Sequence, residues 1–149
     1  MIAVRPALDS DTPGIAACVD AAYRHYVPRI GRKPGPMLRD YAEAIRDEQV
    51  HVVEQNGRII GALVLAVTEE GFLLEMIAVL PSAQGTGVGR RLLEFSEAEA
   101  RRQGYAAIYL YTHEKMTENQ ALYSKIGYLE YDRRTEQGLA RVYMRKELR

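Results

Sequence analysis

A glycine-rich segment, Gln84-Gly85-Thr86-Gly87-Val88-Gly89, lies between a predicted strand and a predicted helix. Its alternating glycines leave the backbone N–H groups almost uncovered, and the helix directs its positive N-terminal end at the same place. The segment is neither a dinucleotide fingerprint nor a P-loop, because Arg90-Arg91 stand where a Lys-Ser/Thr pair would be. A flexible connection is the alternative, but each glycine costs about 0.5–1 kcal/mol relative to Ala in an ordered element. The spacing therefore predicts a site for a phosphorylated cofactor.

A second group of polar residues lies on a short helix predicted from Thr117 to about Ile126. Asn119, Leu122 and Tyr123 are three and four residues apart, so they share one face of this helix. A face that only packs against a core would carry an apolar residue in place of Asn119. The stripe is therefore more polar than packing alone requires.

Glu75 is the only ionisable residue in the strand predicted from Phe72 to Val79. By strand alternation it shares a face with apolar residues, where a carboxylate could accept a proton directly or through water. The alternative is an ion pair with a nearby Arg that serves the structure. His113 and Glu114, at the end of a later strand, are secondary candidates for the base. His51 is expected to be a surface residue of its strand.

Several elements must position these residues, and hydrophobic periodicity with turn signals predicts them. Three successive strands joined by short turns predict an antiparallel meander, and the Pro- and Gly-rich stretch Val27–Pro36 is expected to be a loop. Strands are expected at Ile2–Arg5, Val50–Glu54, Ile59–Val67, Phe72–Val79, Ala107–Tyr111, Tyr128–Arg134 and Leu139–Arg145. Helices are expected from Thr12-Pro13 to Tyr23, from Pro36 to Ile45, from Val88 to Gln103, and from Thr117, in a capping box with Gln120, to Ile126. The order predicts one α+β domain over residues 1–149.

Composition narrows the class of protein. The 149 residues include 20 Lys plus Arg and 20 Asp plus Glu, and this balance argues against nucleic-acid binding through bulk charge. The single cysteine, Cys18, excludes a disulfide framework and is expected to be a buried structural thiol. The N-terminus does not resemble a signal peptide, and the longest apolar run, Ile59–Val67, is far short of the ~20 residues of a membrane span. We expect a cytoplasmic protein without a metal site.

Two motifs together resemble a known family. Val79-x-Pro81-x-x-Gln84-Gly85-x-Gly87-x-Gly89 is similar to the acyl-CoA pyrophosphate-binding signature of the GNAT superfamily of acyl-CoA-dependent N-acyltransferases. Asn119-x-Ala121-Leu122-Tyr123-x-x-x-Gly127-Tyr128 resembles that family's second signature, and the strand order matches along essentially the whole chain. The resemblance implies a single-domain fold with a mostly antiparallel twisted sheet of about seven strands, about four helices, and a splay between strands 72–79 and 107–111.

The resemblance also implies roles for these residues. The CoA pyrophosphate would lie on backbone N–H groups of the Gln84–Gly89 turn, the pantetheine arm would pair with the backbone of the preceding strand, and Tyr123 would face the thioester sulfur. For Arg90 and Arg91 a phosphate contact and a solvated helix face remain alternatives, and Lys125 is a weaker candidate for the 3′-phosphate. The implied cofactor-binding residues are Ile77, Ala78, Val79, Gln84, Gly85, Thr86, Gly87, Val88, Gly89, Arg90, Asn119 and Tyr123. The implied catalytic residues are Tyr123 and Glu75.

The function implied is transfer of an acetyl group from acetyl-CoA to a primary amine by direct attack in a ternary complex. The acceptor would be a small molecule or amino acid, with a peptide or protein N-terminus, or a non-catalytic acyl-CoA sensor, as alternatives. The basic, aromatic segment 23–33 lies where the family places a substrate loop, and it could bind a carboxylate or be an ordinary solvated loop. The oligomeric state stays open, a homodimer included. The candidate substrate contacts are Tyr26, Arg29, Ile30, Tyr111 and His113.

Overall fold

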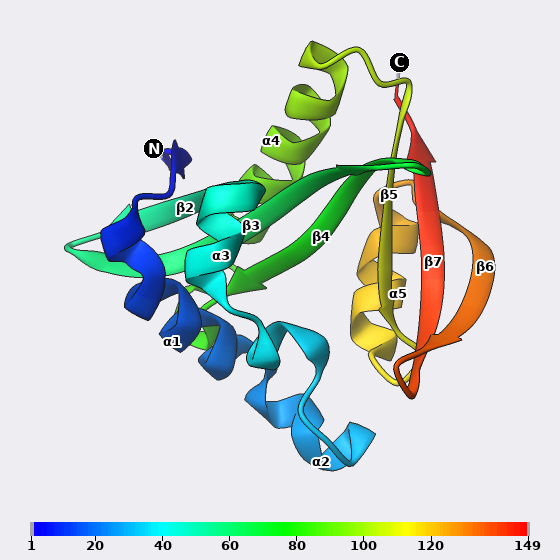
Figure 1. Cartoon of the computed structure of the whole chain (residues 1–149), viewed down its shortest axis with the longest axis horizontal. Coiled ribbons are helices and arrows are strands. Elements are labelled where there is room, and N and C mark those ends of the chain that lie inside the picture. Colours follow the sequence, from blue (N-terminus) through cyan, green and yellow to red (C-terminus); the bar gives the residue numbers. More distant parts are fainter. Residues whose placement is uncertain (1, 149) are drawn as a thin grey trace.

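The computed structural model describes residues 2–148 of the chain, and within them seven strands form one sheet in the order β1-β2-β3-β4-β5-β7-β6. All neighbouring strands are antiparallel except β4 and β5, which are parallel (Figure 1). The predicted fold is therefore confirmed. The strands are β1 (Arg5–Pro6), β2 (Gln49–Gln55), β3 (Arg58–Thr68), β4 (Gly71–Val79), β5 (Ala107–His113), β6 (Leu129–Glu136) and β7 (Leu139–Glu147).

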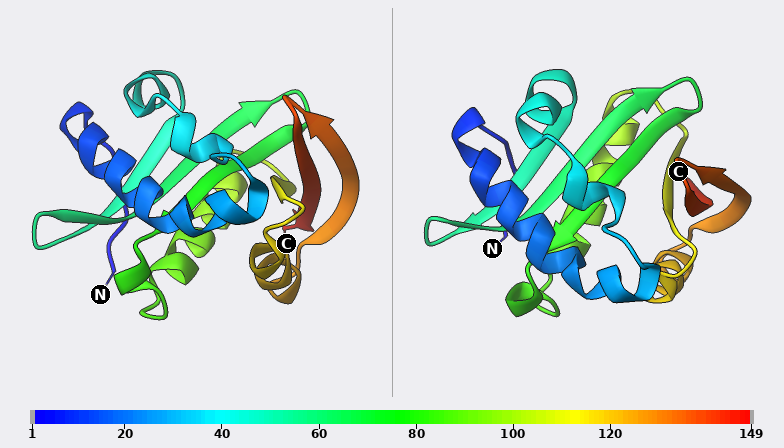
Figure 2. Two further views of the ribbon diagram at one scale, coloured as in Figure 1. Left: turned by 90° about the horizontal axis from the view of Figure 1, so that it is seen from below. Right: turned by 60° about the horizontal axis from the view of Figure 1, so that its bottom comes forward.

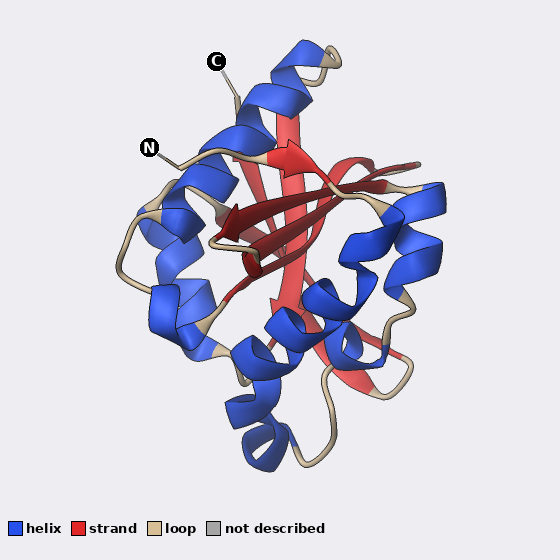
Figure 3. Cartoon of the chain, turned by 90° about the vertical axis from the view of Figure 1, so that its left-hand side faces the viewer, coloured by secondary structure: helices blue, strands red, loops and turns tan. Residues whose placement is uncertain are grey.

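Helices lie on both sides of this sheet (Figure 3). The helices α1 and α3 pack against β2, β3 and β4, and α4 packs against β3 and β4 from the other side. The helix α5 lies beside β5 and β6, next to the one-turn helix α2 (Figure 2). The bounds are α1 (Thr12–Tyr23), α2 (Val27–Ile30), α3 (Tyr41–Asp47), α4 (Val88–Arg102) and α5 (Thr117–Lys125).

The two halves of the sheet diverge where β4 meets β5. These strands pair only from Phe72 to Leu74, opposite Ile108 to Leu110. At the same point β4 bulges, since Met76 and Leu74 face consecutive residues of β3 and leave Glu75 without a partner there. Beyond the bulge, β4 and β5 run apart and leave the β5-facing edge of β4 without a strand (Figure 1).

Two hairpin turns are built on residues with positive φ. Asn56-Gly57 joins β2 to β3 and Gln137-Gly138 joins β6 to β7. Both residues of each turn have positive φ, at 53° and 78° in the first and 53° and 76° in the second. This is the backbone that a two-residue turn needs to match the twist of its strands.

The N-terminal half differs from the prediction in three places. The first strand is Arg5–Pro6 instead of Ile2–Arg5. The expected loop Val27–Pro36 contains the one-turn helix α2, followed by a 3₁₀ turn that begins at Gly35. The helix expected from Pro36 begins at Tyr41, because the carboxylate of Asp40 accepts the N–H groups of the first turn at 3.0 and 3.2 Å.

The start of α5 also differs. Thr117 is the first helical residue and does not cap the helix, so the predicted capping box is wrong. The Gln120 amide instead donates to the carbonyls of His113 and Glu114, at 3.2 and 2.9 Å. Leu122, which was expected to share the stripe of Tyr123, is 47% exposed. The helix is therefore held to the end of β5 by a side chain, and only part of the expected stripe is buried.

Two residues outside the site can be placed against their predictions. Cys18 is buried as expected, and burial raises the pKa of its thiol to about 11. His51, expected at the surface, is half-buried: its ring packs on Phe95 with centroids 4.6 Å apart, and burial lowers its pKa. No helix within residues 2–148 is both long and apolar enough to cross a membrane.

Replacement of Asp40 by Ala is expected to lower the free energy of unfolding by about 0.5–2 kcal/mol, because two N–H groups of α3 lose their acceptor. Chemical denaturation measures this change. Asp40→Asn, which keeps an acceptor oxygen, is expected to stay close to the wild type. Equal stability of Asp40→Ala and the wild type would show that the cap contributes nothing.

Candidate active site

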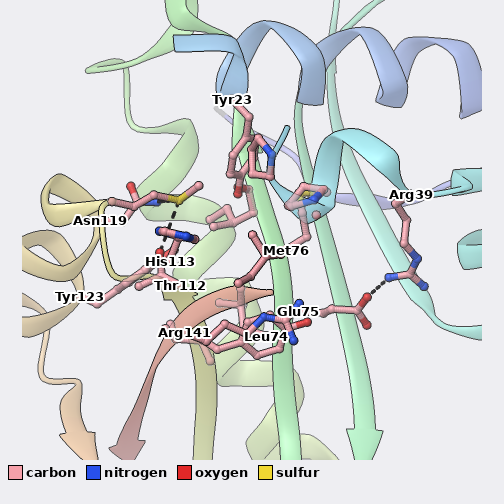
Figure 4. A pocket seen from close by; sticks show the side chains of 18 of the residues that line it. Tyr23, Arg39, Leu74, Glu75, Met76, Thr112, His113, Asn119, Tyr123 and Arg141 are labelled. Carbon is pink, nitrogen blue, oxygen red and sulfur yellow. Dashed lines mark hydrogen bonds and ion pairs between the residues drawn. The ribbon is translucent and has the colours of Figure 1, made fainter. Parts of the chain in front are cut away.

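A cavity of about 380 Å³ opens at the splay between β4 and β5. Its walls come from the end of α1, the segment around Pro34–Pro36, the bulged part of β4, the end of β5, α5 and the β6–β7 hairpin (Figure 4). This volume lies within the range of small-molecule sites, about 300–1,000 Å³. Of the residues predicted from sequence, the cavity brings together Glu75, Ile77, Tyr111, His113, Asn119 and Tyr123.

Tyr123 presents its hydroxyl to this cavity from α5. Its side chain is buried, and its ring packs edge-on against Tyr128 with centroids 5.7 Å apart. Burial raises its pKa, so the hydroxyl keeps its proton at neutral pH. Within residues 2–148 this hydroxyl has no hydrogen-bond partner, so it is a donor available to a ligand.

Asn119 lies one turn before Tyr123 on α5 and also lines the cavity. Its amide nitrogen donates to the sulfur of Met116 at 3.7 Å, and its oxygen accepts from the Tyr26 hydroxyl at 3.5 Å. Both contacts are long, and an amide has two donor hydrogens and two acceptor sites. Asn119 therefore keeps hydrogen-bonding capacity for a bound molecule.

Glu75 lines the cavity from the β4 bulge and forms an ion pair with Arg39. Arg39 also pairs with Glu48, at 2.6 Å, so its guanidinium lies between two carboxylates. The Glu75 carboxylate points toward Arg39 and away from Tyr123 (Figure 4). The ion pair with a nearby Arg, which the sequence analysis gave as the alternative to a base, is thus present in the structure. The Glu75 carboxylate is nevertheless part of the cavity wall.

The glycine-rich turn lies outside this cavity, at the N-terminus of α4. Gly85 and Gly87 have φ of +79° and +97°, which L side chains rarely adopt, and Gly87 is the N-cap of the helix. The first N–H groups of a helix have no intrahelical partner, so those of Val88, Gly89 and Arg90 stay available. A Cβ at Gly85 would meet no atom within 4 Å, so the space above the turn is open.

Three residues in or next to the turn have partners that the sequence did not predict. The backbone N–H of Thr86 donates to the carbonyl of Ala83 at 3.3 Å, and the side-chain amide of Gln84 donates to the carbonyl of Val79 at 3.4 Å. Arg90 is 84% exposed and lies 3.5 Å from Glu94 on its own helix. Gln84 and Thr86 therefore hold the turn in shape, and Arg90 lies on the solvated face.

The edge of β4 beyond the splay carries the residues expected to pair with pantetheine. Ile77, Ala78 and Val79 face β3 on one side and have no strand on the other. The carbonyl of Ile77 already accepts a hydrogen bond of 2.8 Å from the Tyr23 hydroxyl. A ligand along this edge would therefore find the Ile77 carbonyl occupied by the protein.

Of the expected substrate segment 23–33, Tyr23 lines the cavity and residues 24–33 do not. Tyr26 is buried, Ile30 packs against the core, and Arg29 pairs with Glu118 of α5 at 2.5 Å. The side chains of Tyr26 and Arg29 contact α5, and none of the three lines the cavity. The segment just after them, around Pro34–Pro36, lies against the cavity instead.

Sequence reasoning did not single out part of the cavity wall. The wall residues that were not predicted come together only through tertiary contacts. The sequence contains a local indication for Arg141 alone, because Arg141, Tyr143 and Arg145 alternate on one face of β7. That face becomes informative once β7 is known to pair with β5. The wall residues not predicted include Arg39, Tyr41, Met76, Thr112, Met116 and Arg141.

Residues 46–130 match the family described as "Acetyltransferase (GNAT) domain". The chain belongs to the GNAT acetyltransferase family. Its GNAT fold superposes on the PaiA N-acetyltransferase of Thermoplasma acidophilum, solved in complex with coenzyme A, with a TM-score of 0.81 over 99% of both chains at 16% identity. The GNAT motifs identified from sequence, in the turn and on α5, both lie within the matched residues.

Two acetyltransferases are similar to this chain in sequence. An "IAA acetyltransferase" of Azospirillum brasilense is 37% identical over 81 residues, which are 53% of this chain and 53% of that protein. A "Mycothiol acetyltransferase" of Jonesia denitrificans is 33% identical over 91 residues, 58% of this chain and 29% of that protein. The matched regions thus span about half, or less, of the relatives' own lengths.

Proposed function

We propose that the protein is an acetyl-CoA-dependent N-acetyltransferase that transfers an acetyl group to a primary amine of a small molecule. The observation that carries this proposal is the splay, where one cavity joins the open edge of β4 to a free Tyr123 hydroxyl and a Glu75 carboxylate. Family membership supports acetyl transfer, and the two relatives named for IAA and mycothiol support a small-molecule acceptor.

The residues present fit acyl-CoA. The α4 N-terminus offers free N–H groups beside two glycines with positive φ, which suits a pyrophosphate. The edge of β4 offers backbone groups to a linear amide chain, in the manner of an added strand. Asn119 and Tyr123 lie across the splay from that edge and retain hydrogen-bonding capacity. The proposed cofactor contacts are thus the outward-facing backbone N–H groups of Ile77 and Val79 and those of Val88–Arg90, together with two side chains of α5.

Acetyl-CoA supplies the acetyl group, activated as a thioester. In the proposed mechanism Tyr123 donates a hydrogen bond to the departing sulfur, and its raised pKa keeps this donor protonated. Glu75, held by Arg39, accepts the proton of the acceptor ammonium directly or through a water in the cavity. The freed amine would then attack the thioester carbonyl directly, without a covalent enzyme intermediate. The carbon–sulfur bond would break, and the second nitrogen proton would leave with the thiol of CoA.

The direct test is thiol release from acetyl-CoA against a panel of primary amines, amino acids and N-terminal peptides, with acetyl-CoA binding measured in parallel. Release with a small amine and mass-spectrometric detection of its N-acetyl product would support the proposal. Release with peptides alone would place the acceptor among protein N-termini. Binding of acetyl-CoA without release for any member of the panel would contradict catalysis and favour a sensor.

Gly87→Ala is expected to raise the KM for acetyl-CoA about tenfold, because it disturbs N–H groups that would hold a charged phosphate. The substitution also places a Cβ at a φ of +97°, with a cost of about 1–2 kcal/mol in stability. Gly57→Ala is the matched control, because Gly57 has a φ of +78° in a distant hairpin turn. A Cβ at Gly57 would meet no atom within 4 Å, and one at Gly87 would make only an ordinary contact of 3.5 Å with Ile2 Cδ1. Steady-state kinetics should show an unchanged KM for acetyl-CoA in Gly57→Ala. An equal rise of this KM in both variants would contradict phosphate binding by the glycine-rich turn.

A further inference from the structure

His113 ends β5 and presents one defined donor to the cavity. Its Nδ1 accepts the backbone N–H of Lys115 at 3.1 Å, so the proton of the neutral ring resides on Nε2. Burial lowers the pKa of His113, which keeps the ring neutral at pH 7. A ring in this state cannot take a proton at Nε2, and the described residues provide no acceptor for the Nε2–H. His113 is therefore a hydrogen-bond donor rather than a base.

Arg141 is the cross-strand partner of His113 on β7. Directly paired residues of neighbouring strands project from the same face of a sheet with adjacent side chains. The guanidinium packs 4.4 Å from the centre of the Tyr111 ring, and one nitrogen, Nη1, donates to Glu136 at 3.1 Å. Its side chain is 18% exposed and lines the same cavity as His113. The remaining donors of its five N–H groups are free for a ligand.

Arg39, the other cationic residue of the cavity, cannot do the same. Its guanidinium already lies between the carboxylates of Glu75 and Glu48. The cavity therefore has two different sides: the Glu75 carboxylate, paired with Arg39, lies on the β4 side, and the N–H groups of Arg141 and His113 that have no partner among residues 2–148 lie on the β5–β7 side. A molecule that carries both an ammonium and a carboxylate matches this arrangement.

We infer that His113 and Arg141 form a carboxylate-binding subsite and that the acceptor amine carries a carboxylate, as an amino acid does. Guanidinium and imidazole N–H groups suit the two oxygens of a planar carboxylate, and the Tyr111 ring holds the guanidinium in place. The ammonium of the same molecule would lie toward Glu75. This inference rests on the proposed acetyl transfer, whose acceptor it specifies.

The first experiment compares an amino acid with its carboxamide as acceptors. The wild type is expected to prefer the amino acid, and Arg141→Met is expected to lower kcat/KM for it about 10- to 100-fold while the carboxamide changes less than about threefold. Arg145→Met is the matched control, since Arg145 lies on the same strand, packs on Tyr131 at 4.7 Å and is outside the cavity lining. Equal losses for both acceptors, or in both variants, would overturn the inference.

A pair of His113 variants separates the ligand contact from the loop contact. In His113→Asn the side chain can still accept the Lys115 N–H but has no donor at the Nε2 position, so it is expected to raise KM for the amino acid about tenfold. His113→Gln places an amide N–H near the Nε2 position and is expected to recover most of this loss. Wild-type KM in His113→Asn would contradict a role for the Nε2–H.

Binding gives a readout that does not depend on turnover. Calorimetric titration of N-acetyl amino acids into the CoA-saturated protein is expected to show binding that Arg141→Met weakens about tenfold or more, whereas N-acetyl amino acid amides bind weakly to both proteins. Carboxylate-dependent binding without any thiol release would support the subsite and contradict the proposed catalysis. Thiol release with no preference for a carboxylate would support catalysis and overturn the subsite.

Discussion

Tyr123→Phe is expected to lower kcat about 100-fold or more while leaving the KM for acetyl-CoA within about twofold, as for loss of a single transition-state donor. The side chain is buried, and its hydroxyl is protonated and has no hydrogen-bond partner among residues 2–148, so its removal takes away one hydrogen bond to the ligand and little packing. Steady-state kinetics with acetyl-CoA and an active amine, together with a CoA titration, separate the two effects. An unchanged kcat would remove Tyr123 from the mechanism.

Tyr128→Phe is the matched control for this substitution. Tyr128 packs against Tyr123, and its own hydroxyl is buried without a hydrogen-bond partner in the described structure. Loss of that hydroxyl is expected to leave kcat unchanged and to keep or raise the melting temperature, because a buried unpaired polar group costs about 1–3 kcal/mol. A comparable fall in kcat for both variants would point to a packing effect rather than to the Tyr123 donor.

Glu75→Gln is expected to lower kcat/KM for the acceptor about 100-fold, within the range of general base catalysis. Removal of a proton from an amine of pKa ~10.4 costs about 4–5 kcal/mol at pH 7, compared with about 2 kcal/mol for release of a thiol of pKa ~8.5 as thiolate. The amine proton is thus the larger barrier. The pH–rate profile of Glu75→Gln should contain one ionisation fewer on its acidic side, whereas an unshifted profile would indicate another base or water.

Glu48→Gln controls for the shared arginine. Glu48 pairs with Arg39, as Glu75 does, but does not line the cavity. Its replacement changes the charge beside Arg39 by the same amount, and the acceptor kinetics and the pH profile are expected to stay close to those of the wild type. If Glu48→Gln reproduced the loss seen in Glu75→Gln, the effect would belong to the position of Arg39 and not to proton transfer.

Local signals explain which parts of the fold could be predicted. Asn56-Gly57 and Gln137-Gly138 demand positive φ in two-residue turns, and Gly85 and Gly87 mark the start of α4 in the same way. The helix start at Asp40 was missed because Pro36 gives an equally good local signal, and only the structure shows which turn the carboxylate caps. Turns and helix starts were predicted correctly where the sequence contains one local signal for them. The start of α3 was placed wrongly, because two residues, Pro36 and Asp40, each give a signal for a helix start.

The candidate site divides in a similar way. Spacing alone predicts that Asn119 and Tyr123 share a helix face, and the resemblance to the family's second signature implies their roles. Glu75 could be singled out by its isolation in an apolar strand. The partner of Glu75 could not be predicted, because Arg39 reaches it from a distant segment and the β4 bulge changes the direction of the Glu75 side chain. Arg141 likewise depends on the pairing of β5 with β7, which periodicity does not reveal.

The bare edge of β4 also bears on the solubility of the protein. An unpaired strand edge is ordinarily a template on which another chain can add, and it can lead to aggregation. Here the Tyr23 hydroxyl donates to the Ile77 carbonyl, so an incoming strand could not form its backbone hydrogen bond to that carbonyl in the middle of the edge. One tyrosine on α1 thus leaves room for a short, flexible ligand and discourages the continuous β-pairing through which copies of the chain would assemble.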